Sequence, residues 1–358
     1  MIAIFTYSRR LSTQHYCMKK WLFWTGMLVL LIVAVGLITI YSWSQTPYGT
    51  LDYKAALGLW LLYEPPDFHI FTVAELRARY LEEEKTLTDE YKQWVETSFD
   101  TILSTAVGKI PVRVYKPESG EKLPVIVYYH GGGFVFGTLN EYNTFCAKLA
   151  YFSSALVVSV DYRLAPEHPY PAAVEDAYAA LQWAYHNAFL IGGDSSRMAV
   201  AGSSAGGNLA AVVAQMTRDR QDAQLRYQVL LYPATQSVNL ETDSHLKYGK
   251  DFGLTTQHVA WYIDQYLPNT MDRYEAYASP LLAEDLSHLP PALVVVAGFD
   301  PLRSEGEDYA IRMQEAGVEV SLVNYETMIH GFAKISAFHQ SDKVLKEAGK
   351  ILYNAFYQ

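Results

Sequence analysis

Short runs of apolar, largely β-branched residues recur along the chain between about residue 102 and residue 324. Each run has the length of a strand, and apolar residues at helical spacing fill the intervals between the later runs. Strands that alternate with helices are typical of a mostly parallel sheet covered on both faces. The pattern therefore predicts an α/β fold with an eight-stranded sheet, its strands near residues 102–107, 110–116, 123–129, 156–160, 197–201, 227–231, 292–297 and 318–324.

The N-terminus carries a different pattern, because residues 21–43 are almost entirely apolar and contain no charge. The stretch is long enough to cross a bilayer, and aromatic residues lie near both of its ends, as in an interfacial belt. Positive flanks stay in the cytoplasm. We therefore predict a cytoplasmic segment at 1–20, a single-pass transmembrane anchor at 21–43 and a main domain on the outer, periplasmic or lumenal side. The basic residues before the anchor are Arg9, Arg10, Lys19 and Lys20.

A cleaved signal peptide is the main alternative interpretation of this segment. Ser42, Trp43 and Ser44 form a weak processing site, and cleavage there would make the protein secreted. The apolar run exceeds a normal signal-peptide core, which favours an uncleaved anchor. A buried core helix is a third interpretation.

A serine stands between two glycines in the run Gly202-Ser203-Ser204-Ala205-Gly206. A predicted strand precedes it and a predicted helix with small residues follows it, which is the context of a nucleophile at a sharp strand-to-helix turn. Glycine avoids the clash of a Cβ atom where strand and helix pass close together. The motif therefore nominates Ser204 as a nucleophile. A glycine-serine loop without chemistry is the alternative.

A second glycine cluster, Gly131, Gly132 and Gly133, follows the apolar run 124–129. Its spacing does not match the loops that hold nucleotide phosphates. Bare backbone N–H groups can instead hold the negative oxygen that forms during acyl transfer. Two of these glycines are expected to form an oxyanion hole with the N–H of Ala205. His130, just before them, is interpreted as a residue that braces the loop.

A serine nucleophile needs a base, and the base needs a carboxylate that orients it. Asp300 follows the apolar run 292–297, and His330 follows the last predicted strand. Since ligands of parallel sheets bind at the carboxyl ends of the strands, both residues are expected on the same edge as Ser204. His339 is the nearest rival base. The rival acids are Glu305 and Asp308, expected on a solvated helix face, and Glu326.

Taken together, these motifs resemble the hormone-sensitive-lipase-like branch of the α/β-hydrolases, which includes bacterial carboxylesterases and arylacetamide deacetylase. The resemblance runs from about Val112 to the C-terminus. It implies that Ser204, Asp300 and His330 form a catalytic triad. Ser203 and Ser304 depart from the family, which usually has Asp or Thr at the first position and an acid at the second. The motifs are His130 to Gly133, Asp161 to Pro169, Gly202 to Gly207, Asp300 to Arg303 and His330 to Phe332.

The resemblance also implies a small helical cap. Helical spacing around Leu76 and Trp94 predicts small helices in the linker region 44–100, ahead of a catalytic domain at 101–358. Together with residues 236–277, which are rich in tyrosine and leucine, these helices are expected to shape the acyl and alcohol pockets as the family's cap does.

Composition narrows the picture further. Half of the 358 residues are hydrophobic, enough for a sizeable core, and the net charge of −10 opposes nucleic-acid binding. The two cysteines, Cys17 and Cys146, lie on opposite sides of the predicted anchor, which excludes an intrachain disulfide in that topology. The predicted chemistry needs no metal and no other cofactor.

The sequence thus predicts a membrane-anchored serine ester hydrolase that acts on short- to medium-chain acyl esters of small molecules. The alternatives are an amidase or deacetylase, a long-chain lipase on the same triad, and a hydrolase-fold receptor that binds small molecules without turnover. His330 favours catalysis over the receptor, because plant gibberellin receptors, which resemble the family, have lost its histidine. The oligomeric state is left open.

Overall fold

A computed structural model describes the chain except for residues 1, 62–69, 85–88, 118–119 and 121. Residues 2–17, which include Arg9, Arg10 and Cys17, are described by their backbone alone. The chain divides into two compact units, residues 1–62 and 63–358.

The first unit contains helix α1 (Ile2–Ser44), the short antiparallel strands β1 (Gln45–Thr46) and β2 (Gly49–Thr50), and helix α2 (Tyr53–Leu61). Within α1, the segment Met18–Ser44 has a mean hydropathy of 2.5, and none of its most apolar stretch is buried. This helix is long and apolar enough to cross a membrane, and a signal sequence has the same properties. The Trp43 ring stacks on the Trp60 ring of α2, with centroids 5.1 Å apart.

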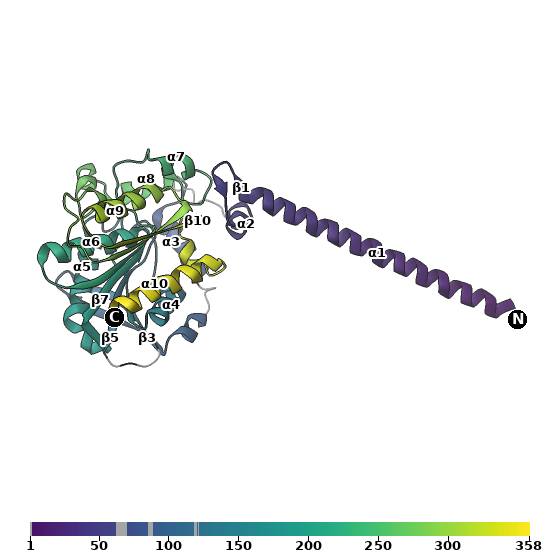
Figure 1. Cartoon of the computed structure of the whole chain (residues 1–358), viewed down its shortest axis with the longest axis horizontal. Coiled ribbons are helices and arrows are strands. Elements are labelled where there is room, and N and C mark those ends of the chain that lie inside the picture. Colours follow the sequence, from purple (N-terminus) through teal and green to yellow (C-terminus); the bar gives the residue numbers. More distant parts are fainter. Residues whose placement is uncertain (1, 62–69, 85–88, 118–119, 121) are drawn as a thin grey trace. The chain divides into compact units, whose positions relative to one another are not determined.

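The second unit is built on an eight-stranded sheet in the order β10-β9-β8-β7-β5-β6-β4-β3 (Figure 1). Only β4 runs against its neighbours, since it pairs antiparallel with both β3 and β6. The mostly parallel α/β sheet predicted from the sequence is therefore confirmed. The strands are β3 (Thr97–Thr105), β4 (Gly108–Lys116), β5 (Leu123–Tyr129), β6 (Leu156–Val160), β7 (Gly193–Ser203), β8 (Leu225–Leu231), β9 (Ala292–Phe299) and β10 (Val320–Ile329).

Helices cover both faces of this sheet. Strands β5 and β9 are buried at every residue, which explains why they read as continuous apolar runs without alternation. Helices α4 (Asn143–Ser153) and α10 (His339–Tyr357) pack together on one face. The other face carries α5 (Ala172–Asn187), α6 (Ala205–Arg220) and α9 (Arg303–Glu315).

Smaller elements join the strands and the main helices of this unit. Helix α3 (Val73–Glu84) precedes the sheet, while α7 (Asp243–Tyr248), α8 (Thr256–Tyr266), η3 (Thr270–Tyr274) and η4 (Pro280–Leu282) lie between β8 and β9 in the chain. The remaining short helices are η1 (Asp89–Trp94), η2 (Ala188–Ile191) and η5 (Phe332–Lys334).

Two features of the region before the sheet were not predicted from the sequence. Strand β3 starts at Thr97, before the catalytic-domain boundary expected at 101. The segment around Trp94 is a 3-10 helix, and the Trp94 ring packs against Tyr151 and Phe152 at the C-terminal end of α4. Trp94 therefore packs on the outside of α4, a helix that lies on the sheet.

Candidate active site

Ser204 lies at a sharp turn between β7, which ends at Ser203, and α6, which begins at Ala205. Its backbone adopts φ 55° and ψ −119°, a strained conformation that non-glycine residues rarely adopt. A Cβ atom at Gly202 would overlap the carbonyl oxygen of Gly206, and one at Gly206 would overlap the carbonyl oxygen of Tyr129. The two glycines of the motif are therefore required by the close approach of strand and helix.

The structure brings Ser204, His330 and Asp300 into one hydrogen-bonded chain. His330 Nδ1 lies 2.7 Å from Asp300 Oδ2, and His330 Nε2 lies 2.8 Å from Ser204 Oγ. Because a carboxylate can only accept, Nδ1 carries the proton in this arrangement, and Nε2 is free to accept the hydrogen of the serine hydroxyl. Asp300 is fully buried, and its Oδ1 accepts a 2.8 Å bond from the N–H of Leu302, which holds the carboxylate in place.

The rival residues lie elsewhere. His339 begins α10 with an exposed side chain, and Asp308 and Glu326 are also exposed. Glu305 was expected on a solvated face, and that expectation is wrong, since its side chain is 1% exposed. In α9 the Glu305 side chain turns toward Thr235 and Gln236, in the segment after β8, instead of toward solvent, which the spacing of apolar residues did not reveal.

The glycine loop after β5 presents backbone donors next to the serine turn. The N–H of Gly131 already donates to Tyr142 Oη at 3.1 Å. Among the residues that the structure describes, the N–H groups of Gly132, Gly133 and Ala205 have no protein acceptor. Gly132 (φ 124°) and Gly133 (φ 62°) adopt backbone conformations that favour glycine, and these conformations turn the peptide groups of the loop. Three donors thus remain for an anionic oxygen.

His130 is buried within this loop. Its Nδ1–H donates to the carbonyl oxygen of Gly131 at 2.8 Å, and its ring stacks on Tyr162 at 4.3 Å. Burial lowers the pKa of His130 to about 4, so that the ring is neutral near pH 7. These contacts favour the bracing role over a role in proton transfer.

Ser203 and Ser304, which depart from the family's usual residues, both have hydrogen-bond partners nearby. Ser203 Oγ lies 3.0 Å from the hydroxyl of Tyr128, a fully buried residue of β5. Ser304 exchanges bonds with Ser244 of α7: each backbone N–H donates to the other's hydroxyl oxygen, at 3.1 and 3.2 Å. Ser244 Oγ also donates to the carbonyl oxygen of Pro301 at 2.6 Å. The loop after β9 is thus attached to α7.

Residues of α3 and α8 that the sequence did not single out contact the glycine loop and the residues just after it. Arg77 of α3 donates from Nε to the carbonyl oxygen of Val135 at 2.9 Å and from Nη2 to that of Ala165 at 2.7 Å. From α8, the Tyr262 ring occupies the space where a Cβ atom of Gly133 would lie. Tyr266 of the same helix stacks on Phe134 with ring centroids 3.7 Å apart. An arginine in a predicted helix is expected to face solvent, so nothing in the sequence indicated that Arg77 contacts this loop.

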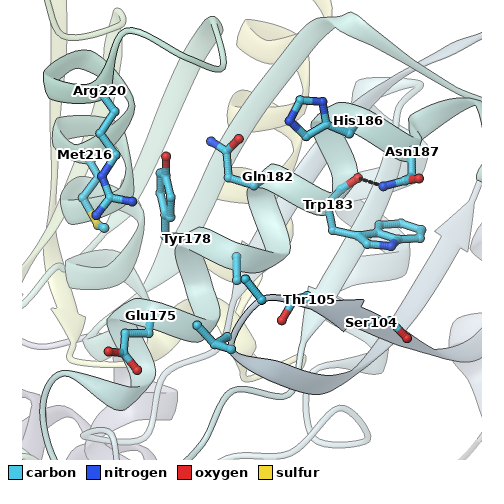
Figure 2. Close-up of a pocket in the computed structure, with 13 residues that line it drawn as sticks. Ser104, Thr105, Glu175, Tyr178, Gln182, Trp183, His186, Asn187, Met216 and Arg220 are labelled. Atoms are coloured by element: carbon cyan, nitrogen blue, oxygen red, sulfur yellow. Dashed lines mark hydrogen bonds between the residues drawn. The ribbon is translucent and has the colours of Figure 1, made fainter.

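A separate surface pocket of about 480 Å³ lies between the β3–β4 turn, α5 and the C-terminal part of α6 (Figure 2). Tyr178, Trp183 and Met216 are among the residues that line it, whereas Ser204, Asp300 and His330 are not. This pocket is therefore distinct from the serine site.

A mostly parallel sheet with a serine at the strained turn after a central strand defines the class of the α/β-hydrolases. The chain belongs to this family: the pattern described as the alpha/beta hydrolase fold matches residues 126–334. The resemblance to its hormone-sensitive-lipase-like branch is confirmed.

Named relatives agree with this membership. The carboxylic ester hydrolase LipN of Mycobacterium tuberculosis is 45% identical over 246 residues, covering 66% of this chain and 64% of LipN. The carboxylesterase NlhH of the same species is 41% identical over 276 residues, covering 74% of this chain and 82% of NlhH. A solved esterase from Pyrobaculum calidifontis has a TM-score of 0.78 and 40% identity, covering 85% of this chain and 98% of its own. The chain is a hydrolase of the carboxylesterase type.

Proposed function

We propose that this protein is a serine carboxylesterase that acts on short- to medium-chain acyl esters of small molecules through an acyl-enzyme. The observation that carries the proposal is the hydrogen-bonded chain from Ser204 Oγ through His330 to buried Asp300. The names of the relatives, which are ester hydrolases and esterases, support the same reaction.

The reaction follows from the roles of these groups. His330 Nε2 takes the Ser204 Oγ proton as the oxygen attacks the ester carbonyl carbon, while Asp300 stabilises the imidazolium. The carbonyl oxygen becomes negative and accepts bonds from the N–H groups of Gly132, Gly133 and Ala205. When the tetrahedral intermediate collapses, His330 gives the proton to the departing alcohol oxygen, leaving the acyl group on Ser204. Water then repeats the cycle, with His330 as the base, and releases the acid.

Gly131, predicted as one of three possible loop donors, has a lesser part in this proposal. Its N–H is engaged by Tyr142, so Gly132 and Gly133 are the two glycines that combine with Ala205. His130 supports the loop through its hydrogen bond to the carbonyl oxygen of Gly131. No metal or cofactor enters any of these steps.

The rate constant kcat/KM for nitrophenyl esters is expected to peak at acyl chains of roughly two to eight carbons. Each added methylene gains about 0.8 kcal/mol only while apolar wall is there to receive it. Tyr262 of α8 lies against Gly133, and Arg77 of α3 binds the carbonyl oxygen of Val135 just after the glycines. We propose that these two helices limit the length of the acyl group that the site accepts. The measurement is a series of esters of increasing length with the full-length protein in detergent, and matched anilides report amidase activity.

Other outcomes of that series favour the alternatives. A steady rise through long acyl chains, with activation on emulsified triglyceride, contradicts the proposed chain length and indicates a lipase. Faster turnover of the anilides indicates an amidase or deacetylase. Binding of esters with no turnover indicates a receptor.

We propose further that α1 anchors the protein in the membrane as a single span, with its N-terminus in the cytoplasm and the catalytic unit outside. The apolar segment Met18–Ser44 and the basic residues before and at its start support this topology. Protease added to intact cells or spheroplasts is expected to digest the catalytic unit. Protection equal to that of a cytosolic marker contradicts the orientation, and a mature N-terminus after Ser44 indicates a cleaved signal peptide and a secreted enzyme.

A further inference from the structure

Glu305 is a buried carboxyl group that the proposed reaction does not use. It lies in the first turn of α9, close after Asp300, and its side chain is 1% exposed. Its Oε1 accepts the N–H of Thr235 at 2.7 Å, and its Oε2 accepts the side-chain amide of Gln236 at 2.9 Å. The N–H of Gln236 makes a longer contact of 3.5 Å with Oε1. Every one of these partners is a donor.

The segment that Glu305 holds also touches the nucleophile turn. Ala234, the residue before Thr235, donates its N–H to the carbonyl oxygen of Ser204 at 3.3 Å. Asn208 of α6 donates from its side chain to the carbonyl oxygen of Ala234 at 2.8 Å. Residues 234–236 therefore lie between the strained turn at Ser204 and Glu305, with a hydrogen bond to each.

The donors around Glu305 match an ionised carboxylate. When Glu305 is protonated, one oxygen becomes a donor, and it then faces N–H groups that cannot accept. Burial raises the pKa of Glu305 to about 8, while the bonds from Thr235 and Gln236 act in the opposite direction and the charge of Asp300 raises the pKa further. The neighbouring elements also carry other titratable groups, among them His245 of α7, Tyr232 after β8, and Arg303, Glu307 and Tyr309 of α9.

We propose that Glu305 is a positioning residue: in its ionised form it holds residues 234–236 against the turn that presents Ser204. The Glu305 side chain makes no hydrogen bond to Ser204, Asp300 or His330, so we infer that its effect passes through the Ala234–Ser204 contact. Loss of the carboxylate leaves the buried N–H of Thr235 without its acceptor. It also removes one of the two acceptors of the Gln236 side-chain amide, which still donates to the carbonyl oxygen of Asn239 at 2.7 Å. A small displacement of a nucleophile lowers the rate of the chemical step more than substrate binding.

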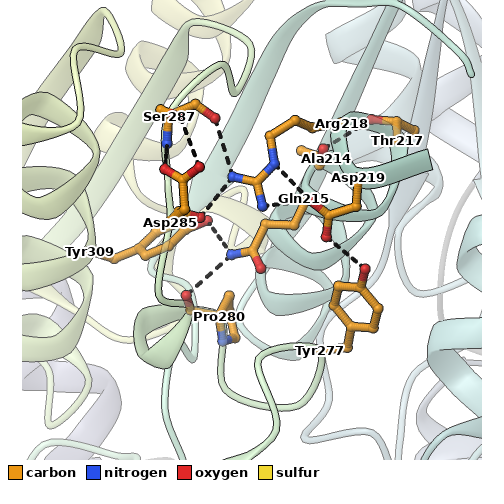
Figure 3. A network of polar contacts seen from close by, with 10 residues as sticks. All are labelled: Ala214, Gln215, Thr217, Arg218, Asp219, Tyr277, Pro280, Asp285, Ser287 and Tyr309. Atoms are coloured by element: carbon orange, nitrogen blue, oxygen red, sulfur yellow. Dashed lines mark hydrogen bonds and ion pairs between the residues drawn. The ribbon is translucent and has the colours of Figure 1, made fainter. Parts of the chain in front are cut away.

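The same face of α9 offers a matched control in Tyr309. Its hydroxyl accepts a 3.1 Å bond from Gln215 of α6, and Gln215 also donates to the carbonyl oxygen of Pro280 (Figure 3). Tyr309 is fully buried like Glu305 and also links α9 to another element. Tyr309→Phe thus removes a buried hydrogen bond of α9 without removing an acid.

The test measures kcat and KM for a short-chain ester from about pH 7 to pH 9, on either side of the pKa of about 8. In the wild type, kcat is expected to rise through this range as Glu305 loses its proton. In Glu305→Gln, kcat at the upper end is expected to fall about tenfold, with KM changed less than about twofold and the rise absent. In Tyr309→Phe, kcat is expected to rise with pH as it does in the wild type.

The proposal is overturned if the wild-type kcat does not rise between about pH 7 and pH 9. It is also overturned if Glu305→Gln lowers kcat by the same factor at every pH. If Glu305→Gln does not fold, Gln236→Leu serves in its place, because it removes one hydrogen-bond donor from the Glu305 carboxylate. The rise of kcat is then expected at higher pH, and a rise at the same pH as in the wild type overturns the proposal. The inference rests on the proposed esterase function. No ester turnover by the wild type argues against that function, and ester turnover that survives in Ser204→Ala argues against the proposed nucleophile. The shape of the Glu305→Gln profile bears on the inference alone.

Discussion

Replacing Ser204 by alanine is expected to lower kcat for ester hydrolysis by about a million-fold while the protein remains folded. The serine oxygen forms the covalent bond to the acyl group, and the triad acts as a unit, so the loss of one member removes nearly all of its contribution. The remaining rate comes from binding and from the glycine loop. Ester turnover and circular dichroism of the purified variant measure the two parts of this expectation.

Two histidine variants serve as the matched pair for this experiment. His330→Ala is expected to be as inactive as Ser204→Ala, because it removes the group 2.8 Å from the serine oxygen. His339→Ala changes an exposed side chain at the start of α10 and is expected to be as active as the wild type. Retention of a tenth of the wild-type rate in Ser204→Ala would falsify the assignment of the nucleophile.

Replacing Asp300 by asparagine is expected to lower kcat by about ten-thousand-fold near neutral pH. The amide is close in shape to the carboxylate, but its NH₂ group can only donate. If that group faces His330 Nδ1, the ring keeps its proton on Nε2, and Nε2 can then no longer accept the Ser204 hydrogen. Initial rates with a nitrophenyl ester measure the effect.

Glu326→Gln is the control for the acid. Glu326 is an exposed residue of β10, close to His330 in sequence, and its loss is expected to leave the rate within about twofold of the wild type, because exposed charges contribute little. If Glu326→Gln loses activity and Asp300→Asn does not, the two acids must exchange roles.

The strands could be predicted from the sequence because each buried strand of a parallel sheet is a continuous apolar run. All eight predicted runs overlap observed strands, and 123–129 and 156–160 agree with β5 and β6 at both ends. The ends of other strands differ, as in β10, which extends to Ile329. Hydrogen bonding to neighbouring strands sets such ends, and it depends on register that apolar spacing does not contain.

The cap was less accessible to sequence reasoning. Helical spacing around Leu76 correctly indicated α3, whose Leu76 side chain is buried. The same kind of spacing around Trp94 suggested a cap helix, but that segment packs on α4. Amphipathic spacing shows that a segment buries one face, and it does not show which partner covers that face.

By itself, the sequence determined the fold class and the residues proposed for the reaction, because these depend on local patterns: apolar runs, a serine between glycines, and an acid and a histidine after successive strands. The tertiary structure alone decided which N–H groups of the glycine loop remain unengaged, since Tyr142 occupies that of Gly131. It alone turned Glu305 inward and placed Arg77 on the glycine loop. The reason is physical: a polar side chain has the same local pattern whether it faces water or a buried partner, and only packing between elements distant in the chain decides between them.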